Sequence, residues 1–98
     1  MEIFKKSIEF DWDKGNKEKN LIKHGVSNEE CEEIFFDPHK RVVAPGTYSG
    51  PEERHILIGE TKRNRLLMVI FTMRNQKVRV ISARDLNRKE KGLYEKTT

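Results

Sequence analysis

Apolar positions recur along the chain with the spacings of both strands and helices. The alternating stretch Ile8-Glu-Phe-Asp-Trp12 predicts a short strand with one buried face. Residues 54–61, 66–72 and 78–83 predict three further strands, and the second of these is apolar on both faces, which indicates a central position. A short strand is also expected at residues 41–44.

Two helices are predicted between the first strand and the others, at residues 13–24 and 27–36. Gly25 suits the left-handed residue that ends a helix. Ser27 and Glu30 have the S-x-x-E spacing of a capping box, which marks the start of the second helix. The two helices should therefore form a hairpin with a very short connector.

A terminal helix over residues 86–96 completes the predicted elements, and polar turns at 62–65 and 74–77 join the last three strands. Residues 45–51, rich in Pro, Gly and Ser, predict the one long loop. This order predicts an α+β fold, with an N-terminal strand and a helical hairpin packed on a small antiparallel sheet. The length of 98 residues, without repeats or a linker, favours a single domain over residues 1–98.

Charge is distributed unevenly along the chain, which has a net charge of +4. Residues 1–49 carry 8 Lys/Arg and 10 Asp/Glu, a net of −2, whereas residues 50–98 carry 12 and 6, a net of +6. A basic half suits a polyanionic partner such as nucleic acid, although a basic surface that binds nothing fits equally well.

The composition argues against several other classes of protein. The single cysteine, Cys31, permits no internal disulfide, which fits the cytoplasm. The longest apolar run, residues 66–71, is too short to span a bilayer, so no membrane partner is expected. The histidines, His24, His39 and His55, lack the spacing of a zinc site, so we expect neither a metal nor a cofactor.

Three arginines lie on or beside the predicted central and last strands. Arg65 precedes the central strand, Arg79 lies within the last strand, and Arg84 lies at its exit. Arginines gathered on one face can hold a phosphate bidentately, but they can equally cover apolar surface and pair with local acids. Strict alternation would place Arg79 and Arg84 on opposite faces, unless the strand bulges or ends before Arg84.

Several segments together resemble the BrnT family of bacterial toxins. The resemblance runs from about Ile8 to Tyr94, and the KHGVS and RVISAR motifs are its most specific parts. The matching segments are Phe10–Asp13, Asn20, Lys23–Ser27, Phe35–Pro38, Glu53–Arg54, Ile58–Thr61 and Arg79–Arg84.

This resemblance implies a RelE-like fold and a type II toxin that cleaves RNA without a metal and thereby inhibits translation and growth. It also implies neutralisation by a BrnA-type antitoxin with a ribbon-helix-helix domain, and contact with operator DNA only through that complex. A catalytically inactive member that binds its antitoxin or nucleic acid, and a non-toxic adaptor domain, are the alternatives.

Carried over by position, the resemblance points to Lys23, His24, Arg65, Arg79 and Arg84 as the residues that meet RNA. Histidine can exchange a proton near neutral pH, and arginine can stabilise a charged phosphorane, so His24 and the three arginines are the expected catalytic residues. Glu90 or Tyr94 could assist them. The residues expected to bind substrate are Lys23 and the basic residues of the two turns, Lys62, Arg63, Arg74 and Lys77.

Overall fold

The computed structural model describes residues 8–16, 19–43, 47–48 and 53–95. Its elements, in chain order, are α1 (Lys19–His24), α2 (Asn28–Ile34), β1 (Arg41–Val42), β2 (Thr47–Tyr48), β3 (Glu53–Glu60), β4 (Leu66–Arg74), β5 (Lys77–Asp85) and α3 (Arg88–Glu95). The predicted α+β class is therefore confirmed. No helix among the described residues has both the length and the apolar character that crossing a membrane requires.

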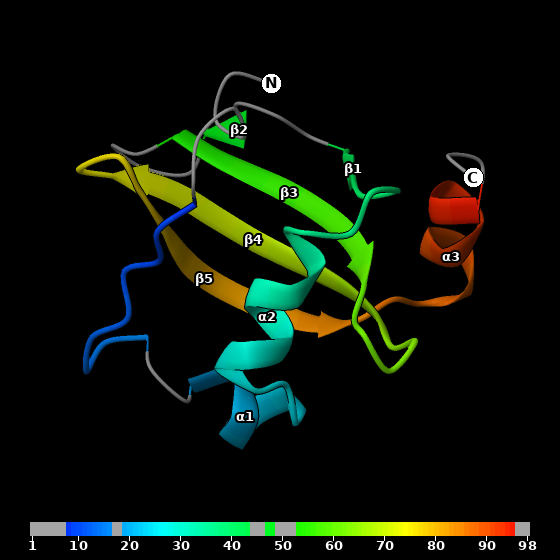
Figure 1. The fold of residues 1–98 in the computed structure, drawn as a ribbon, viewed down its shortest axis with the longest axis horizontal. Helices are drawn as coiled ribbons and strands as arrows, with labels where there is room; N and C mark the ends of the chain where they lie inside the picture. Colours follow the sequence, from blue (N-terminus) through cyan, green and yellow to red (C-terminus); the bar gives the residue numbers. More distant parts are fainter. Residues whose placement is uncertain (1–7, 17–18, 44–46, 49–52, 96–98) are drawn as a thin grey trace.

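The sheet is antiparallel, with the order β1-β3-β4-β5, and β2 pairs separately with β3 (Figure 1). The two-residue turn between β4 and β5 contains Asn75 and Gln76, whose φ angles are +53° and +66°. Positive φ at both central residues is the signature of a type I′ turn, whose twist matches that of the flanking strands. The structure therefore confirms the predicted hairpin of β4 and β5.

Strand β4 contributes to an apolar cluster on each face of the sheet, as predicted for a central strand. On one face, Leu67 and Val69 pack in a cluster with Ile34 of α2. On the other, Met68 packs with Tyr94 of α3. Helices α1 and α2 thus form a layer on one side of the sheet, while α3 packs against the opposite face.

The N-terminal strand predicted at residues 8–12 is wrong. The segment makes a single parallel bridge, in which the Asp11 N–H donates to the Val78 carbonyl and the Val78 N–H donates to the Glu9 carbonyl, each over 2.8 Å. The Asn16 side-chain amide then donates to the carbonyls of Asp11 and Val80, over 3.0 and 3.1 Å. A longer ladder would have used the Asp11 carbonyl, so the buried Asn16 side chain ends the pairing.

The first helix is shorter than predicted. Asp13, where the helix was expected to begin, accepts a 2.7 Å hydrogen bond from the Gly15 N–H within a turn, and α1 begins at Lys19. Residues 17–18 lie outside the described part of the chain. The end of α1 is as predicted, because Gly25 follows it with a φ of +67°, in the left-handed region.

The start of the second helix is also confirmed. The Glu30 N–H donates to Ser27 Oγ over 3.1 Å, and the Ser27 N–H donates to Glu30 Oε1 over 3.0 Å. This reciprocal pair is a complete capping box. The helix ends at Ile34, slightly before the predicted residue 36.

The remaining boundaries differ by short stretches. Strand β2, Thr47–Tyr48, lies within the predicted loop 45–51. The other residues of this loop lie outside the described part of the chain. The strand expected at residues 41–44 consists of Arg41–Val42, and residue 44 is not described. Helix α3 begins at Arg88, two residues after the predicted start.

The carboxylate of Asp37 connects three parts of the fold. Its Oδ2 atom accepts hydrogen bonds from the Tyr94 hydroxyl of α3 over 2.7 Å and from the Glu60 N–H of β3 over 2.8 Å. Its Oδ1 atom accepts from the His39 N–H over 2.9 Å. A buried carboxylate is stable only when such donors replace its water, so Asp37 fixes α3 against the end of β3.

Candidate functional site

The predicted site residues lie at opposite ends of strands β4 and β5. Arg65 and Arg84 lie where β4 begins and β5 ends, whereas Arg74 and Lys77 flank the turn at the other end. At the usual rise per residue, the length of β4 separates these ends by roughly 30 Å. The structure therefore does not bring the turn residues Arg74 and Lys77 together with Arg65 and Arg84, although Arg79 lies two residues from Lys77 on β5.

A β-bulge decides the orientation of Arg79 and Arg84. Ile70 pairs with Ser82, but its neighbour Phe71 pairs with Val80, so Ile81 is an extra residue in β5. As a result Arg79 pairs with Thr72 and Arg84 pairs with Met68, four residues apart on β4. Paired residues share a face and alternate positions along a strand do too, so both arginines lie on the α3 side of the sheet.

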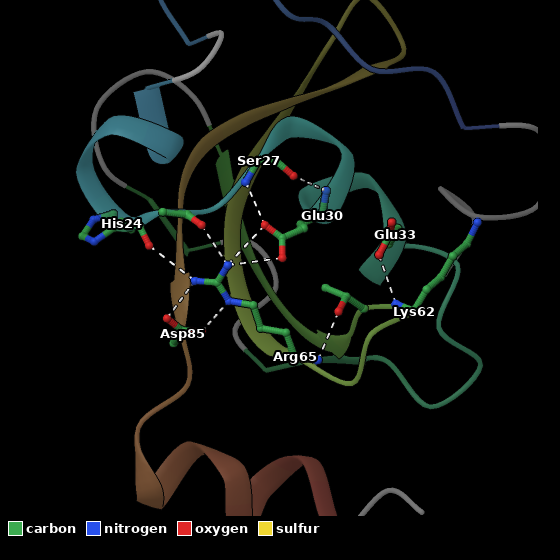
Figure 2. A network of polar contacts seen from close by, with 9 residues as sticks. His24, Ser27, Glu30, Glu33, Lys62, Arg65 and Asp85 are labelled. Atoms are coloured by element: carbon green, nitrogen blue, oxygen red, sulfur yellow. Dashed lines mark hydrogen bonds and ion pairs between the residues drawn. The ribbon is translucent and has the colours of Figure 1, made fainter.

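Arg65 instead belongs to the other side of the strand ends, beside the connector between α1 and α2 (Figure 2). Its Nε and Nη2 atoms donate to Asp85 over 2.7 and 2.9 Å, and its Nη1 atom donates to Glu30 over 3.2 Å. Nη1 also donates to the Gly25 carbonyl over 2.8 Å, and Nη2 donates to the His24 carbonyl over 3.4 Å. We call His24, Glu30, Arg65 and Asp85 the rim cluster.

Electrostatics keep three members of the rim cluster, Glu30, Arg65 and Asp85, charged at neutral pH. The hydrogen bonds from Arg65 lower the pKa of Asp85 against the opposing effect of burial, and nearby positive charge on Lys91 and His24 lowers it further. Burial raises the pKa of Glu30, but the hydrogen bonds from the Ser27 N–H and from Arg65 outweigh it, so the net shift is downward. The pKa of Arg65 is raised, chiefly by its hydrogen bonds to Asp85. Both carboxylates therefore stay ionised beside a permanent cation.

His24 and Lys23 occupy the exposed C-terminal turn of α1. Cations suit this end of a helix because its last carbonyls carry partial negative charge. The backbone of His24 is held by Arg65, while its imidazole faces solvent at the edge of the rim cluster (Figure 2). The structure thus brings the backbone of His24 next to Arg65, and Lys23 precedes it in the same turn of α1.

Arg84 lies beside the rim cluster and is held by α3. Its two Nη atoms each donate to the Glu90 carboxylate over 2.8 Å, and Nη1 also donates to the Asp85 carbonyl over 3.0 Å. These hydrogen bonds from Arg84 lower the pKa of Glu90. Glu90 also accepts from the Asn87 N–H over 3.0 Å, so the same carboxylate starts α3 and holds the arginine.

Arg79 pairs with a different set of acids. It donates to the Asp13 carboxylate over 2.8 and 3.0 Å and lies 3.5 Å from Asp11. The hydrogen bond from Arg79 is the main cause of the lowered pKa of Asp13. The expected cluster of three arginines is thus divided, because each arginine is held by its own carboxylates.

The turn residues Lys62 and Arg63 border acidic hollows on α2 rather than a basic groove. A hollow of about 370 Å³ is lined by Ser27, Glu29, Glu30, Glu33, Thr61 and Arg63. A second, of about 400 Å³, is lined by Glu29, Glu32, Glu33, Phe36 and Lys62. Carboxylates dominate both linings, and like charge disfavours the approach of RNA phosphates over this face.

The sequence-based predictions missed Asp85 and Glu30 as partners of Arg65. One signal was present, because Asp85 and Glu90 are the two acidic residues in the basic stretch between Lys62 and Lys91. In the structure each of these acids pairs with an arginine of the predicted site. Among the described residues, no group of three His, Cys, Asp or Glu side chains could hold a metal ion.

A family model and a solved structure both match this chain. A family model described as "Ribonuclease toxin, BrnT, of type II toxin-antitoxin system" matches residues 12–90, a range that includes the rim cluster. The crystal structure of the Brucella abortus ribonuclease toxin, BrnT, is similar to this chain with a TM-score of 0.61 and 24% sequence identity, over 84% of this chain and 100% of that one. The similarity at this identity shows a shared fold. None of the curated proteins matched the chain.

Proposed function

The chain belongs to the BrnT family of ribonuclease toxins of type II toxin–antitoxin systems, and from this premise we propose that it is a metal-independent endoribonuclease that cleaves RNA and thereby inhibits translation and growth. The observation that carries the proposal is the position of His24, an exposed histidine beside Lys23, with the cations Arg65 and Arg84 at the adjoining strand ends. Such a site offers both proton exchange and positive charge.

Cleavage of this kind needs no cofactor. The ribose 2′-oxygen loses its proton and attacks the adjacent phosphorus, the bond from phosphorus to the 5′-oxygen breaks, and the 5′-oxygen gains a proton. His24 exchanges a proton in one of these two transfers, as a positioned imidazole can. The products carry a 2′,3′-cyclic phosphate and a 5′-hydroxyl.

The charged phosphorane requires stabilisation, which we assign to Arg84. This side chain lies on the α3 side of the sheet and meets the rim cluster through the Asp85 carbonyl at 3.0 Å. Of the Arg84 side chain 36% is exposed, compared with 15% of Arg79. A phosphate that binds Arg84 has to compete with Glu90 for its Nη atoms. Preorganised cations aimed at developing charge commonly supply the largest part of such catalysis.

The other basic residues differ in how well they suit RNA binding. Lys23 adjoins the histidine and can hold a neighbouring phosphate, whereas Lys62 and Arg63 border the acidic hollows on α2, so we do not assign them a phosphate. Arg79 lies along β5, and Arg74 and Lys77 lie at its far end, so they meet only an RNA that runs along the strands. Phosphate contacts of this kind position RNA without reading its sequence.

The partners form part of the same proposal. Membership of a type II family supports a protein antitoxin, which we take to be of the BrnA type with a ribbon-helix-helix domain. The complex, and not the toxin alone, would then contact operator DNA. A cytoplasmic location follows from this role.

A second candidate function is that of an inactive member that binds antitoxin or RNA without cleaving it. The observation in its favour is that Arg65, Arg79 and Arg84 are all paired with carboxylates. RNA must displace at least one of these acids before an arginine can meet a phosphate.

Incubation of the purified protein with end-labelled RNA, with and without EDTA, separates these functions. We expect equal cleavage in both conditions and products with 2′,3′-cyclic phosphate ends. Binding without cleavage at any protein concentration would support the inactive member. Cleavage that EDTA abolishes would contradict the metal-independent mechanism.

A further inference from the structure

We propose that Arg65 is a positioning residue that fixes His24, and not a ligand of the RNA phosphate. The inference rests on the proposed function, because it assumes that His24 acts on RNA. It changes the role expected for Arg65 from the sequence, which grouped this arginine with Arg79 and Arg84.

The first argument is that protein acceptors surround the whole guanidinium of Arg65. A guanidinium has five N–H groups. Its Nε and one N–H of Nη2 face the two oxygens of Asp85, at 2.7 and 2.9 Å. Nη1 faces the Gly25 carbonyl at 2.8 Å and the Glu30 carboxylate at 3.2 Å, and Nη2 also faces the His24 carbonyl at 3.4 Å. These acceptors leave no donor aimed at a ligand.

The second argument concerns what these acceptors belong to. Asp85 ends β5 and Glu30 lies in the first turn of α2, while His24 and Gly25 end α1. The final carbonyls of a helix lack partners within the helix, and a cation satisfies them well. One side chain therefore ties the end of α1 to the strand ends, as Figure 2 shows.

The third argument concerns the consequence for His24. Gly25, with its φ of +67°, turns the chain sharply between α1 and α2, and its carbonyl is the nearest backbone acceptor to Arg65. The backbone of His24 is therefore held on the side of Arg65, while its exposed imidazole projects from the rim. Removing Arg65 frees the residue that carries the imidazole.

Lysine cannot reproduce this arrangement. Its ammonium is a compact charge with three donors, whereas the planar fork of arginine spans acceptors on several sides. The Arg65→Lys variant therefore keeps the charge and most of the stem but loses part of the network. Arg65→Ala removes the network entirely, and Arg88→Ala, at an exposed position in α3, removes the same charge elsewhere.

The test compares these three variants with wild type in two measurements that do not depend on cleavage. One is the salt dependence of binding to an RNA blocked by 2′-O-methyl groups. The other is the NMR signal of the His24 imidazole, with the imidazoles of His39 and His55 as internal references. We expect the salt slopes of Arg65→Ala and Arg88→Ala to be equal. We also expect the His24 signal alone to shift in Arg65→Lys and Arg65→Ala.

A loss of about 0.7 in the salt slope of Arg65→Ala relative to Arg88→Ala would show a lost phosphate contact on single-stranded RNA and overturn the inference. An unshifted His24 signal would overturn it too. If Arg65→Ala fails to fold by circular dichroism, Arg65→Lys decides the question, and an unchanged His24 signal in it overturns the inference.

Single-turnover cleavage supplies the catalytic readout. We expect Arg65→Lys to lower the rate at saturating RNA by up to about 100-fold, the cost of a small misplacement, with unchanged RNA affinity. An unchanged rate would overturn the inference. If wild type binds RNA without cleaving it, while the His24 signal still shifts in the variants, the proposed function fails and the anchoring of His24 by Arg65 stands.

Discussion

Gly59 of β3 packs directly against Ile34 of α2. A Cβ atom there would lie 3.0 Å from Ile34 Cβ and 3.1 Å from the Ile34 carbonyl oxygen. Neither atom can move without shifting α2, so we expect Gly59→Ala to lower the free energy of unfolding by about 1–3 kcal/mol. Urea denaturation followed by circular dichroism measures this change.

Gly92 supplies the matched control for the same substitution. It lies inside α3, and a Cβ there would meet no atom within 4 Å. Alanine favours a helix interior over glycine, so Gly92→Ala should raise the free energy of unfolding by up to about 1 kcal/mol. The close approach of α2 to β3 is contradicted if Gly59→Ala is as stable as wild type.

Where an element begins or ends could be predicted only when the determining contacts are local. Ser27 and Glu30 are three residues apart, and their capping box appears in the structure as the spacing implied. Asn16 ends the N-terminal bridge through the Val80 carbonyl, 64 residues away, which no local pattern indicates. The same holds for the bulge at Ile81, whose carbonyl accepts a 3.3 Å hydrogen bond from Lys19 Nζ of α1.

Junctions between elements should make the fold sensitive to acid. Four carboxylates with lowered pKa values lie at junctions between elements. Glu30 of α2 and Asp85 of β5 both bind Arg65, which precedes β4. Glu90 joins α3 to β5, and Asp37 joins its loop to α3. For Asp37, burial acts to raise the pKa, but the Tyr94 hydroxyl and two backbone N–H groups outweigh it. Such carboxylates stabilise the fold at pH values above their pKa in the unfolded chain, which is 3.8 for Asp and 4.5 for Glu. The stabilisation is lost as the pH falls through the lower pKa values of the folded protein.

We therefore expect the free energy of unfolding in urea to be steady between pH 7 and 5 and to fall steeply between pH 5 and 3. The Asp85→Asn variant should be less stable than wild type at pH 7. Its free energy of unfolding should fall less on acidification than that of wild type, because one of the titrating carboxylates is gone. A wild-type free energy of unfolding that stays constant down to pH 3 would contradict this expectation.

Across the whole molecule, the uneven charge of the sequence is partly neutralised by folding. Arg65 pairs with Glu30 and Arg79 pairs with Asp13, so basic residues of the second half meet acids of the first. The sequence indicated a basic half and three arginines but not their partners, because pairing depends on strand register and on the path of the N-terminal segment. The class of fold could be predicted, whereas the position of His24 beside the strand ends and the carboxylate partner of each arginine could not.

The central claim is that His24 acts on RNA at the rim of the sheet. The most direct test is the single-turnover rate of RNA cleavage in EDTA for His24→Gln, with His39→Gln as the matched control, since both histidines are exposed. Loss of a general acid or base typically lowers a rate by about 10²–10⁴-fold, so His24→Gln should be at least about 100-fold slower and His39→Gln unchanged. Cleavage by His24→Gln at the wild-type rate would contradict the claim.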